Sequence, residues 1–146
     1  MKIINPSIKL EDEIDSQRII KKLERIGRVC YKSEGNINDE SAEKFISNIL
    51  NRNHESVIEH ESISVRIICD RGVTHEIVRH RIASYSQEST RYCNYSNDKF
   101  GNELTFIKPC FFEEGSHKYE IWKNSMQNVE NEYMELIRAG AKPQEA

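Results

Sequence analysis

The sequence predicts a mixed α/β (α+β) fold, made of helices with a few strands, on the basis of three patterns. Apolar residues recur at helical spacing along 42–50, which is the strongest helix signal in the chain. Apolar and polar residues alternate along 62–69, as in a strand with one buried face. Residues 116–137 carry the spacing of a long amphipathic helix.

The first half of the chain is expected to contain a strand and two helices. Met1–Leu10 is mildly strand-like, and Asp15 is expected to open a helix whose apolar residues recur as far as Cys30. The turn-forming segment Ser33–Asn36 breaks this helix. Asn38–Asp39 is expected to cap the next helix, which carries the apolar pattern described above.

The second half is expected to alternate between strands and helices. Ser62–Cys69 is predicted as a strand, and a short helix follows Gly72 and runs through Arg81. Leu104–Ile107 is a second strand candidate that the following proline stops. Ser116–Ile137 is predicted as the long amphipathic helix.

We expect one domain over residues 1–146, because the chain shows no repeat, low-complexity tract or linker. The last residues, Arg138–Ala146, look like a helix end, a glycine stop and the first turn of a further helix opened by Pro143. A frayed tail and a chain that stops before its fold does are both compatible with this ending.

Composition restricts the function classes. A hydrophobic content of 37% with 31% charged residues is polar for a self-sufficient globule, and favours subunit association or an incomplete domain. The net charge of -3 argues against a general nucleic-acid binder. No apolar stretch reaches the length of a membrane span, and the N-terminus lacks a secretory signal, so a cytoplasmic location is expected.

Four scattered cysteines, Cys30, Cys69, Cys93 and Cys110, form no Cys-x-x-Cys pair that would suggest zinc or a redox dithiol. Reduced, structural thiols are therefore expected, with Cys30 and Cys69 on apolar faces. Cys93 lies next to an arginine cluster that can lower the pKa of a thiol, so a nucleophilic role is the alternative for it.

The candidate functional region is Arg79–Tyr92, which contains three arginines, a histidine and several hydroxyl and amide groups. Arginine offers a rigid fork of donors to phosphate or carbonyl oxygens, and histidine adds an aromatic face with a polar edge. A small anionic ligand with a planar heterocycle suits this set. The simpler alternative is a solvated helix end, where Glu76 pairs with Arg79 and His80. The hydroxyl-rich stretch that follows, Ser84–Arg91, favours an anion cradle.

A second group of polar residues lies in His54–His60. Its two histidines are six apart and match neither the zincin pattern nor its inverse, so no metal site is expected. Capping and loop-closing roles for His54, Ser56 and Glu59 are favoured, and a cofactor contact is the alternative.

Arg79-His80-Arg81, followed after seven residues by Ser89, resembles the signature of the flavin-dependent thymidylate synthases, the ThyX family. The likeness extends upstream to His54–His60 and runs from about Arg28 to the chain end. The resemblance implies a methyltransferase that converts dUMP to dTMP, a step of nucleotide biosynthesis. Methylenetetrahydrofolate donates the methylene group, FAD reduced by NADPH supplies a hydride, and arginines with the flavin polarise the uracil instead of a cysteine.

The resemblance also implies site residues and partners, without assigning a catalytic residue. The residues implied to hold FAD are Ser56, Arg79, His80, Arg81 and Gln87. The residues implied to hold dUMP are Glu76, Arg79, Gln87, Glu88, Ser89, Thr90 and Arg91. Ser89 and Arg91 would take the phosphate, and the loop would serve a neighbouring subunit of a homotetramer. The implied fold is a small, mostly antiparallel sheet flanked by helices.

Three departures from the family are visible. Position 76 is Glu where many members have Gln, and the loop has Gln87-Glu88 where some members have Glu and an apolar residue. The family also continues beyond Ala146 with a helical block that carries further flavin and dUMP contacts. This chain is therefore expected to be the N-terminal portion of such an enzyme. A non-catalytic nucleotide- or flavin-binding remnant, and a His/Glu metallohydrolase, are the alternatives.

Overall fold

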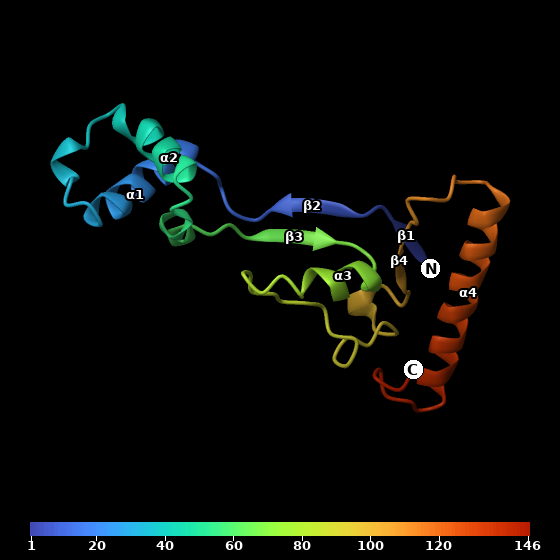
Figure 1. The fold of residues 1–146 in the computed structure, drawn as a ribbon. Helices are drawn as coiled ribbons and strands as arrows, with labels where there is room; N and C mark the ends of the chain where they lie inside the picture. Colours follow the sequence, from blue (N-terminus) through green and yellow to red (C-terminus); the bar gives the residue numbers. More distant parts are fainter. The chain divides into compact units, whose positions relative to one another are not determined.

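The computed structural model describes residues 1–146 and confirms a mixed α/β fold (Figure 1). In chain order the elements are β1 (Lys2–Ile4), β2 (Ser7–Leu10), α1 (Ser16–Val29), η1 (Glu34–Asn36), α2 (Ser41–Asn51), η2 (Glu55–His60), β3 (Val65–Ile68), α3 (Arg71–Ile77), η3 (Asp98–Phe100), β4 (Thr105–Ile107) and α4 (His117–Arg138), where η marks a 3-10 helix. The chain divides into two compact units, Ile8–Arg66 and Met1–Ser7 with Ile67–Ala146. We call them the helical unit and the mixed unit. The single-domain organisation stays a prediction.

The core of the helical unit lies where α1, α2 and η2 meet. Asp15 opens α1 as predicted, because its carboxylate accepts a hydrogen bond from the Arg18 N–H at 3.0 Å. The predicted apolar stripe of α2 faces inward only in part, since Leu50 is exposed. The buried apolar side chains of this core are Leu23, Ala42, Ile49 and Val57.

The closest approach between these helices is at Gly27 of α1. A Cβ atom on this residue would lie 2.7 Å from the Phe45 ring and 3.0 Å from Val57. Glycine is therefore required here by contact with two neighbouring elements, although it lowers helix propensity.

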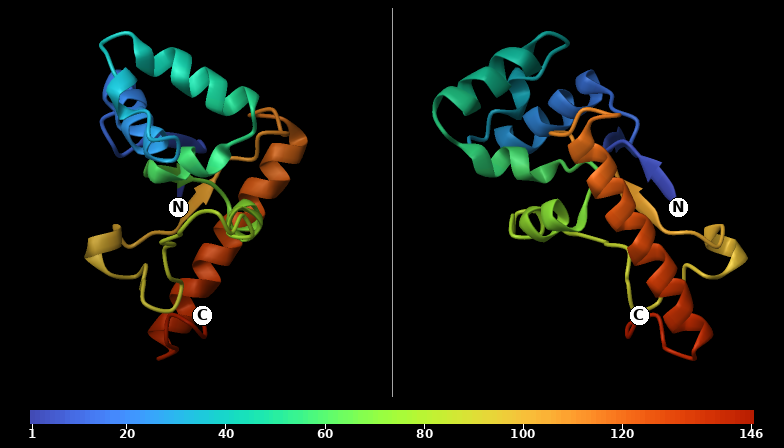
Figure 2. Two further views of the ribbon diagram at one scale, coloured as in Figure 1. Left: turned by 60° about the vertical axis from the view of Figure 1, so that its left-hand side comes forward. Right: turned by 90° about the vertical axis from the view of Figure 1, so that its right-hand side faces the viewer.

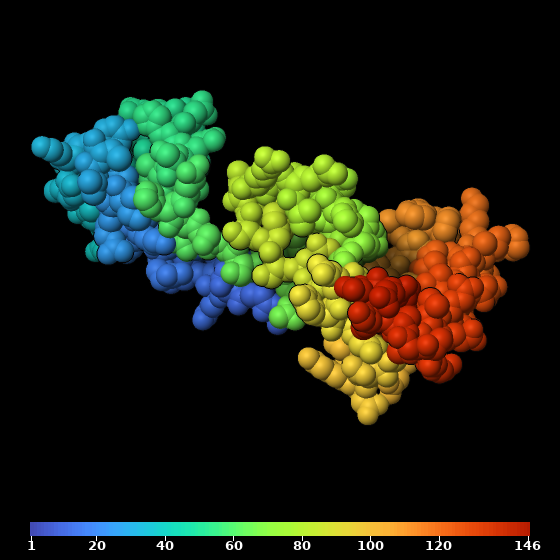
Figure 3. Space-filling view, turned by 90° about the horizontal axis from the view of Figure 1, so that it is seen from below, coloured from blue at the N-terminus to red at the C-terminus, as the bar shows by residue number.

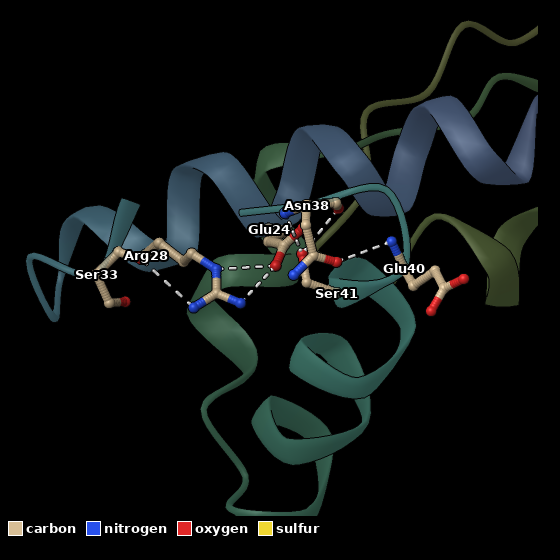
Figure 4. Close-up of polar contacts among 6 residues, drawn as sticks. All are labelled: Glu24, Arg28, Ser33, Asn38, Glu40 and Ser41. Atoms are coloured by element: carbon tan, nitrogen blue, oxygen red, sulfur yellow. Dashed lines mark hydrogen bonds and ion pairs between the residues drawn. The ribbon is translucent and has the colours of Figure 1, made fainter. Parts of the chain in front are cut away.

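Glu24 of α1 is almost fully buried, with 1% of its side chain exposed. Arg28, one turn later, donates to the same Glu24 oxygen from Nε at 2.8 Å and from Nη2 at 2.7 Å (Figure 4). The Arg28 guanidinium also lies 4.7 Å from the centre of the Phe45 ring. The ion pair thus links α1 to the ring of α2.

The start of α2 differs from the prediction that Asn38–Asp39 caps it. The N-cap position is Glu40, whose side chain makes no capping hydrogen bond. Asn38 instead accepts from the Glu40 N–H at 3.0 Å, and the Ser41 hydroxyl accepts from the Asn38 N–H at 3.0 Å (Figure 4). These bonds form a turn before the helix, which is the competing local use of an asparagine side chain.

The mixed unit is built on the parallel pair β1–β4 and the long helix α4 (Figure 2). Lys2 pairs with Thr105 in this ladder. The Glu130 carboxylate of α4 accepts from the Leu104 N–H at 2.8 Å and lies 2.9 Å from the Met1 ammonium. One buried carboxylate therefore ties the strand pair to the helix.

The sheet is divided into two pairs of strands, which the implied single sheet did not anticipate. β1 and β4 are parallel, and the residues between them provide the long connection that parallel strands need. β2 pairs with β3, and the arrows of these strands run in opposite directions (Figure 1). The strand-like segment Met1–Leu10 is interrupted at Pro6, which has no N–H for a ladder.

All four cysteines are free thiols. Cys30 is exposed, contrary to the expected apolar setting, because it is the C-cap residue and lies just beyond the last helical residue of α1. Cys69 is half-buried, and burial with the neighbouring Asp70 charge raises the pKa of its thiol. No helix of the chain is both long and apolar enough to cross a membrane.

Candidate nucleotide-binding site

The motif residues begin on α3, the short helix of the mixed unit. Asp70 caps this helix by accepting from the Val73 N–H at 3.0 Å. The helix ends at Ile77, earlier than the predicted Arg81, and the Arg79 and His80 N–H groups continue it as tight turns to Glu76 and Ile77. Short helices are marginal without extensive packing, and here only Thr74 and Ile77 are partly buried.

The side chains of the motif's basic triplet face solvent. Arg79 Nε lies 3.7 Å from Glu76 Oε1, and both side chains are about three-quarters exposed (74% and 76%). His80 and Arg81 are also exposed. An ion pair this exposed contributes little free energy. The Arg79 guanidinium can therefore leave Glu76 and bind an anionic ligand.

The loop Gln87–Arg91 is tied back onto α3. The Gln87 amide donates to the Thr74 hydroxyl at 2.9 Å. The Arg71 guanidinium donates to the Glu88 carbonyl at 3.2 Å. The loop therefore returns to the short helix that directly precedes the basic triplet.

Glu88 makes a further contact through its carboxylate. The Tyr95 hydroxyl donates to Glu88 Oε1 at 2.5 Å. Burial raises the pKa of the Tyr95 phenol, and the Glu88 carboxylate raises it further, so the phenol stays protonated and able to donate. The Tyr95 N–H donates to the Tyr133 hydroxyl of α4 at 3.2 Å.

Ser89, Thr90 and Arg91 complete the loop. Ser89 is half-buried, its hydroxyl accepts from the Arg91 N–H at 3.3 Å, and its carbonyl accepts from the Cys93 N–H at 3.0 Å. Arg91 reaches the C-terminal residues, since its Nε donates to Gln144 Oε1 at 3.3 Å. Figure 3 shows these C-terminal residues in red against the yellow segment. Thr90 is exposed.

Ser56 belongs to the helical unit, where it lies exposed on η2. His54 precedes this helix, and its Nδ1 is 2.7 Å from the Tyr31 hydroxyl, a contact between the loop after α1 and the start of η2. This contact closes a loop, as expected for His54, whereas no hydrogen bond involves the Glu59 side chain. In residues 1–146, no three His, Cys, Asp or Glu side chains are placed to hold one metal ion.

Sequence reasoning missed Arg71, Thr74 and Tyr95, which hold the loop. Arg71 and Thr74 share a helix with Glu76, so their spacing placed them near the motif. Nothing in the sequence shows that the loop returns to them, because that depends on the turn between Arg81 and Gln87. Tyr95 lies beyond the motif and carries no pattern of its own.

The chain matches the model of the thymidylate synthase complementing protein family over residues 10–146. It is 37% identical over 121 residues to a flavin-dependent thymidylate synthase of Pyrococcus furiosus, which covers 82% of this chain and 49% of that protein. A Geobacter sulfurreducens protein of the same name is 33% identical over 128 residues, covering 82% and 53%. One from Clostridium tetani is 31% identical over 113 residues, covering 73% and 43%.

The chain thus spans about half the length of the curated relatives it matches. No solved structure matches it. The signature Arg79-His80-Arg81 with Ser89 lies inside the matched residues, as does every residue of the candidate loop. On the family match and the relatives together, this chain belongs to the thymidylate synthase complementing protein family.

Proposed function

We propose that this chain forms part of a flavin-dependent thymidylate synthase that methylates dUMP to dTMP. The relatives carry that name, and the proposal extends it to this chain. The observation that carries the proposal is the return of the loop Gln87–Arg91 onto α3. That return holds the Gln87 amide and the Glu88 backbone on the helix that carries Glu76 and directly precedes Arg79.

The polar side chains of this region match the phosphate and the uracil edge of dUMP. Ser89 and Arg91 offer a hydroxyl and a guanidinium to the phosphate, a pairing that suits a dianion. Glu76 and Arg79 offer an acceptor and a donor to the edge of the uracil. In this arrangement Arg79 offsets the negative charge of Glu76, where many family members have a neutral amide.

The exposed triplet Arg79–Arg81 also fits FAD, because two guanidiniums and an imidazole suit an anionic, aromatic cofactor. We assign Gln87 and Ser56 to the same cofactor. When bound, FAD reduced by NADPH supplies the hydride that completes the methyl group. The residues of this chain orient dUMP and polarise its uracil while methylenetetrahydrofolate donates the carbon.

The test is release of tritium from C5-labelled dUMP. The methylene carbon replaces the C5 hydrogen, which leaves as a proton, so turnover transfers tritium to water. We expect release that requires NADPH and methylenetetrahydrofolate, from a protein that takes up FAD and turns yellow. A protein that takes up no FAD and releases no tritium contradicts the proposal.

A second candidate is a nucleotide- or flavin-binding protein without turnover. The observation that favours it is that the polar groups of α3 and the loop are all assigned to ligand binding, and none of them to a catalytic step. Calorimetry with dUMP separates the two: heat of binding together with no tritium release supports the binding protein alone. Bound zinc at one equivalent by elemental analysis would instead favour the metallohydrolase.

We propose in addition that the site is shared between subunits of a homotetramer. The exposure of Arg79, His80 and Arg81 supports this, because a site with so little cover from its own chain needs a neighbour to exclude water. Sedimentation of the chain with and without FAD tests it, and a monomer under both conditions contradicts it.

A further inference from the structure

We propose that Tyr95 is a positioning residue for the nucleotide loop Gln87–Arg91, which it orders by holding the carboxylate of Glu88. The proposal deepens the function given above, since dUMP is the ligand assigned to this loop. Tyr95 lies outside the motif and is not assigned to either ligand.

Tyr95 is itself fixed on the body of the mixed unit. Its N–H donates to the Tyr133 hydroxyl at 3.2 Å, and its ring lies 6.1 Å from the ring of Tyr133. The ring also packs edge-on against Phe100, with 5.5 Å between centres. From this anchored position the hydroxyl reaches Glu88 Oε1 at 2.5 Å. A tyrosine anchored against α4 thereby sets the position of a side chain on an exposed loop.

The negative charge of Glu88 is the reason why its hydrogen bond with Tyr95 matters for ligand binding. Glu88 directly precedes Ser89 and lies three residues from Arg91, the two residues assigned to the phosphate. A Glu88 carboxylate that is free to move can approach the phosphate dianion, which it repels, and can compete for the Arg91 guanidinium. The Tyr95 donor keeps the carboxylate occupied, so Arg91 remains available to the ligand.

The experiment is a double-mutant cycle read by dUMP affinity. Tyr95→Phe keeps the ring and removes the donor. We expect the Kd for dUMP to rise about tenfold, the effect of losing one hydrogen bond to a charged group. When Glu88→Gln is already present, Tyr95→Phe should change the Kd less than about twofold, because a neutral amide neither repels phosphate nor competes for arginine. Tyr119→Phe is the control, since the Tyr119 hydroxyl of α4 makes no hydrogen bond.

A purely structural role for Tyr95 predicts a different pattern, with the same loss of affinity whether position 88 is Glu or Gln. That pattern overturns the proposal and leaves the proposed function standing, as does an unchanged Kd in Tyr95→Phe. A Tyr95→Phe chain that fails to fold, judged by its thermal transition, also overturns it. If the unaltered chain binds no dUMP in the calorimeter, the assignment of dUMP falls, and the positioning role falls with it.

Discussion

Glu24 is the most deeply buried carboxylate of the chain, and its burial depends on Arg28. Removing one partner of a buried pair leaves an unpaired charge, which costs about 3–5 kcal/mol. Arg28→Met should therefore lower the free energy of unfolding by about 3 kcal/mol, measured by urea denaturation of the chain.

Lys21→Met is the matched control, because Lys21 is half exposed and pairs at 3.8 Å with a fully exposed Asp39. It should leave the unfolding midpoint nearly unchanged, since exposed pairs contribute little. Equal midpoints for the two variants would show that Glu24 is tolerated in the core without its partner.

Glu130 couples the stability of the mixed unit to pH. Burial raises the pKa of Glu130, but hydrogen bonds from the Met1 ammonium, the Leu104 N–H and Gln127 outweigh it and lower the pKa from 4.5. The hydrogen bond to Glu130 raises the pKa of the ammonium from 8.0. The carboxylate's contribution is thus present above pH 4.5 and lost as pH falls through its lowered pKa. The ammonium's contribution is present below pH 8.0 and lost as pH rises through its raised pKa.

We therefore expect Glu130→Gln to lower the Tm most between pH 4.5 and 8.0. The effect should be smallest at strongly acidic and strongly basic pH, because the unsubstituted chain has lost the ion pair between Glu130 and the Met1 ammonium there. Thermal melts across pH 3–10 check this. Glu135→Gln, on an exposed part of α4, is the control and should follow the ordinary chain at every pH. A Tm difference between Glu130→Gln and the ordinary chain that does not vary with pH would contradict the assignment.

The sequence alone identifies the residues of the candidate loop as part of the motif, but it does not show which residues they contact. The spacing between Arg79 and Ser89 identifies the motif, whereas the hydrogen bond between Gln87 and Thr74 depends on how the intervening turn folds. The bond from Tyr95 to Glu88 likewise depends on α4, which holds Tyr95 through Tyr133. Contacts between segments that are distant in sequence produce no periodic pattern in the amino-acid sequence, so they could not be predicted from it.

At the scale of elements, Gly27 decides how closely α1 packs. Alanine normally favours a helix over glycine by about 1 kcal/mol. Here its Cβ would meet the Phe45 ring at 2.7 Å, and the Arg28 guanidinium over that ring resists its movement. Gly27→Ala should therefore destabilise the chain by about 1–3 kcal/mol, the usual cost of overpacking.

Gly35→Ala is the control for this prediction, because nothing lies within 4 Å of the Cβ that it would add. Urea denaturation should show a lower midpoint for Gly27→Ala alone. A midpoint that rises for Gly27→Ala would mean that the ring moves freely, so that helix propensity sets the outcome.

The helices were better predicted than the sheets. Asp15 caps α1 as expected, and Ser116, where the long helix was predicted to begin, caps α4. Such caps can be read from sequence because a capping side chain acts on N–H groups only a few residues away. The strand at Thr105–Ile107 was also predicted, but its parallel partner β1 was not. Strand pairing joins residues about a hundred positions apart, and alternation within one strand carries no information on its neighbour.

At the scale of the whole molecule, the chain buries little apolar surface by itself. Only six apolar side chains are buried, whereas twenty large ones are more than a third exposed. Three of the exposed ones, Ile121, Val129 and Leu136, recur at spacings of eight and seven residues along α4 and so lie near one face of the helix. Such a stripe on a long helix favours association with another apolar surface.

We therefore expect the chain to self-associate, with a Tm that rises over a roughly hundredfold increase in protein concentration, because association stabilises the folded state by mass action. Leu136→Lys should lower the sedimentation coefficient and remove the concentration dependence, since a charge in an apolar interface is costly. Asn124→Lys adds the same charge to α4 at an exposed polar position, on the side of Ile121 opposite to Val129 and Leu136, and should sediment like the ordinary chain. If both lysine variants associate as the ordinary chain does, α4 is not the associating face, and the exposed apolar residues of the remaining elements must account for any oligomer.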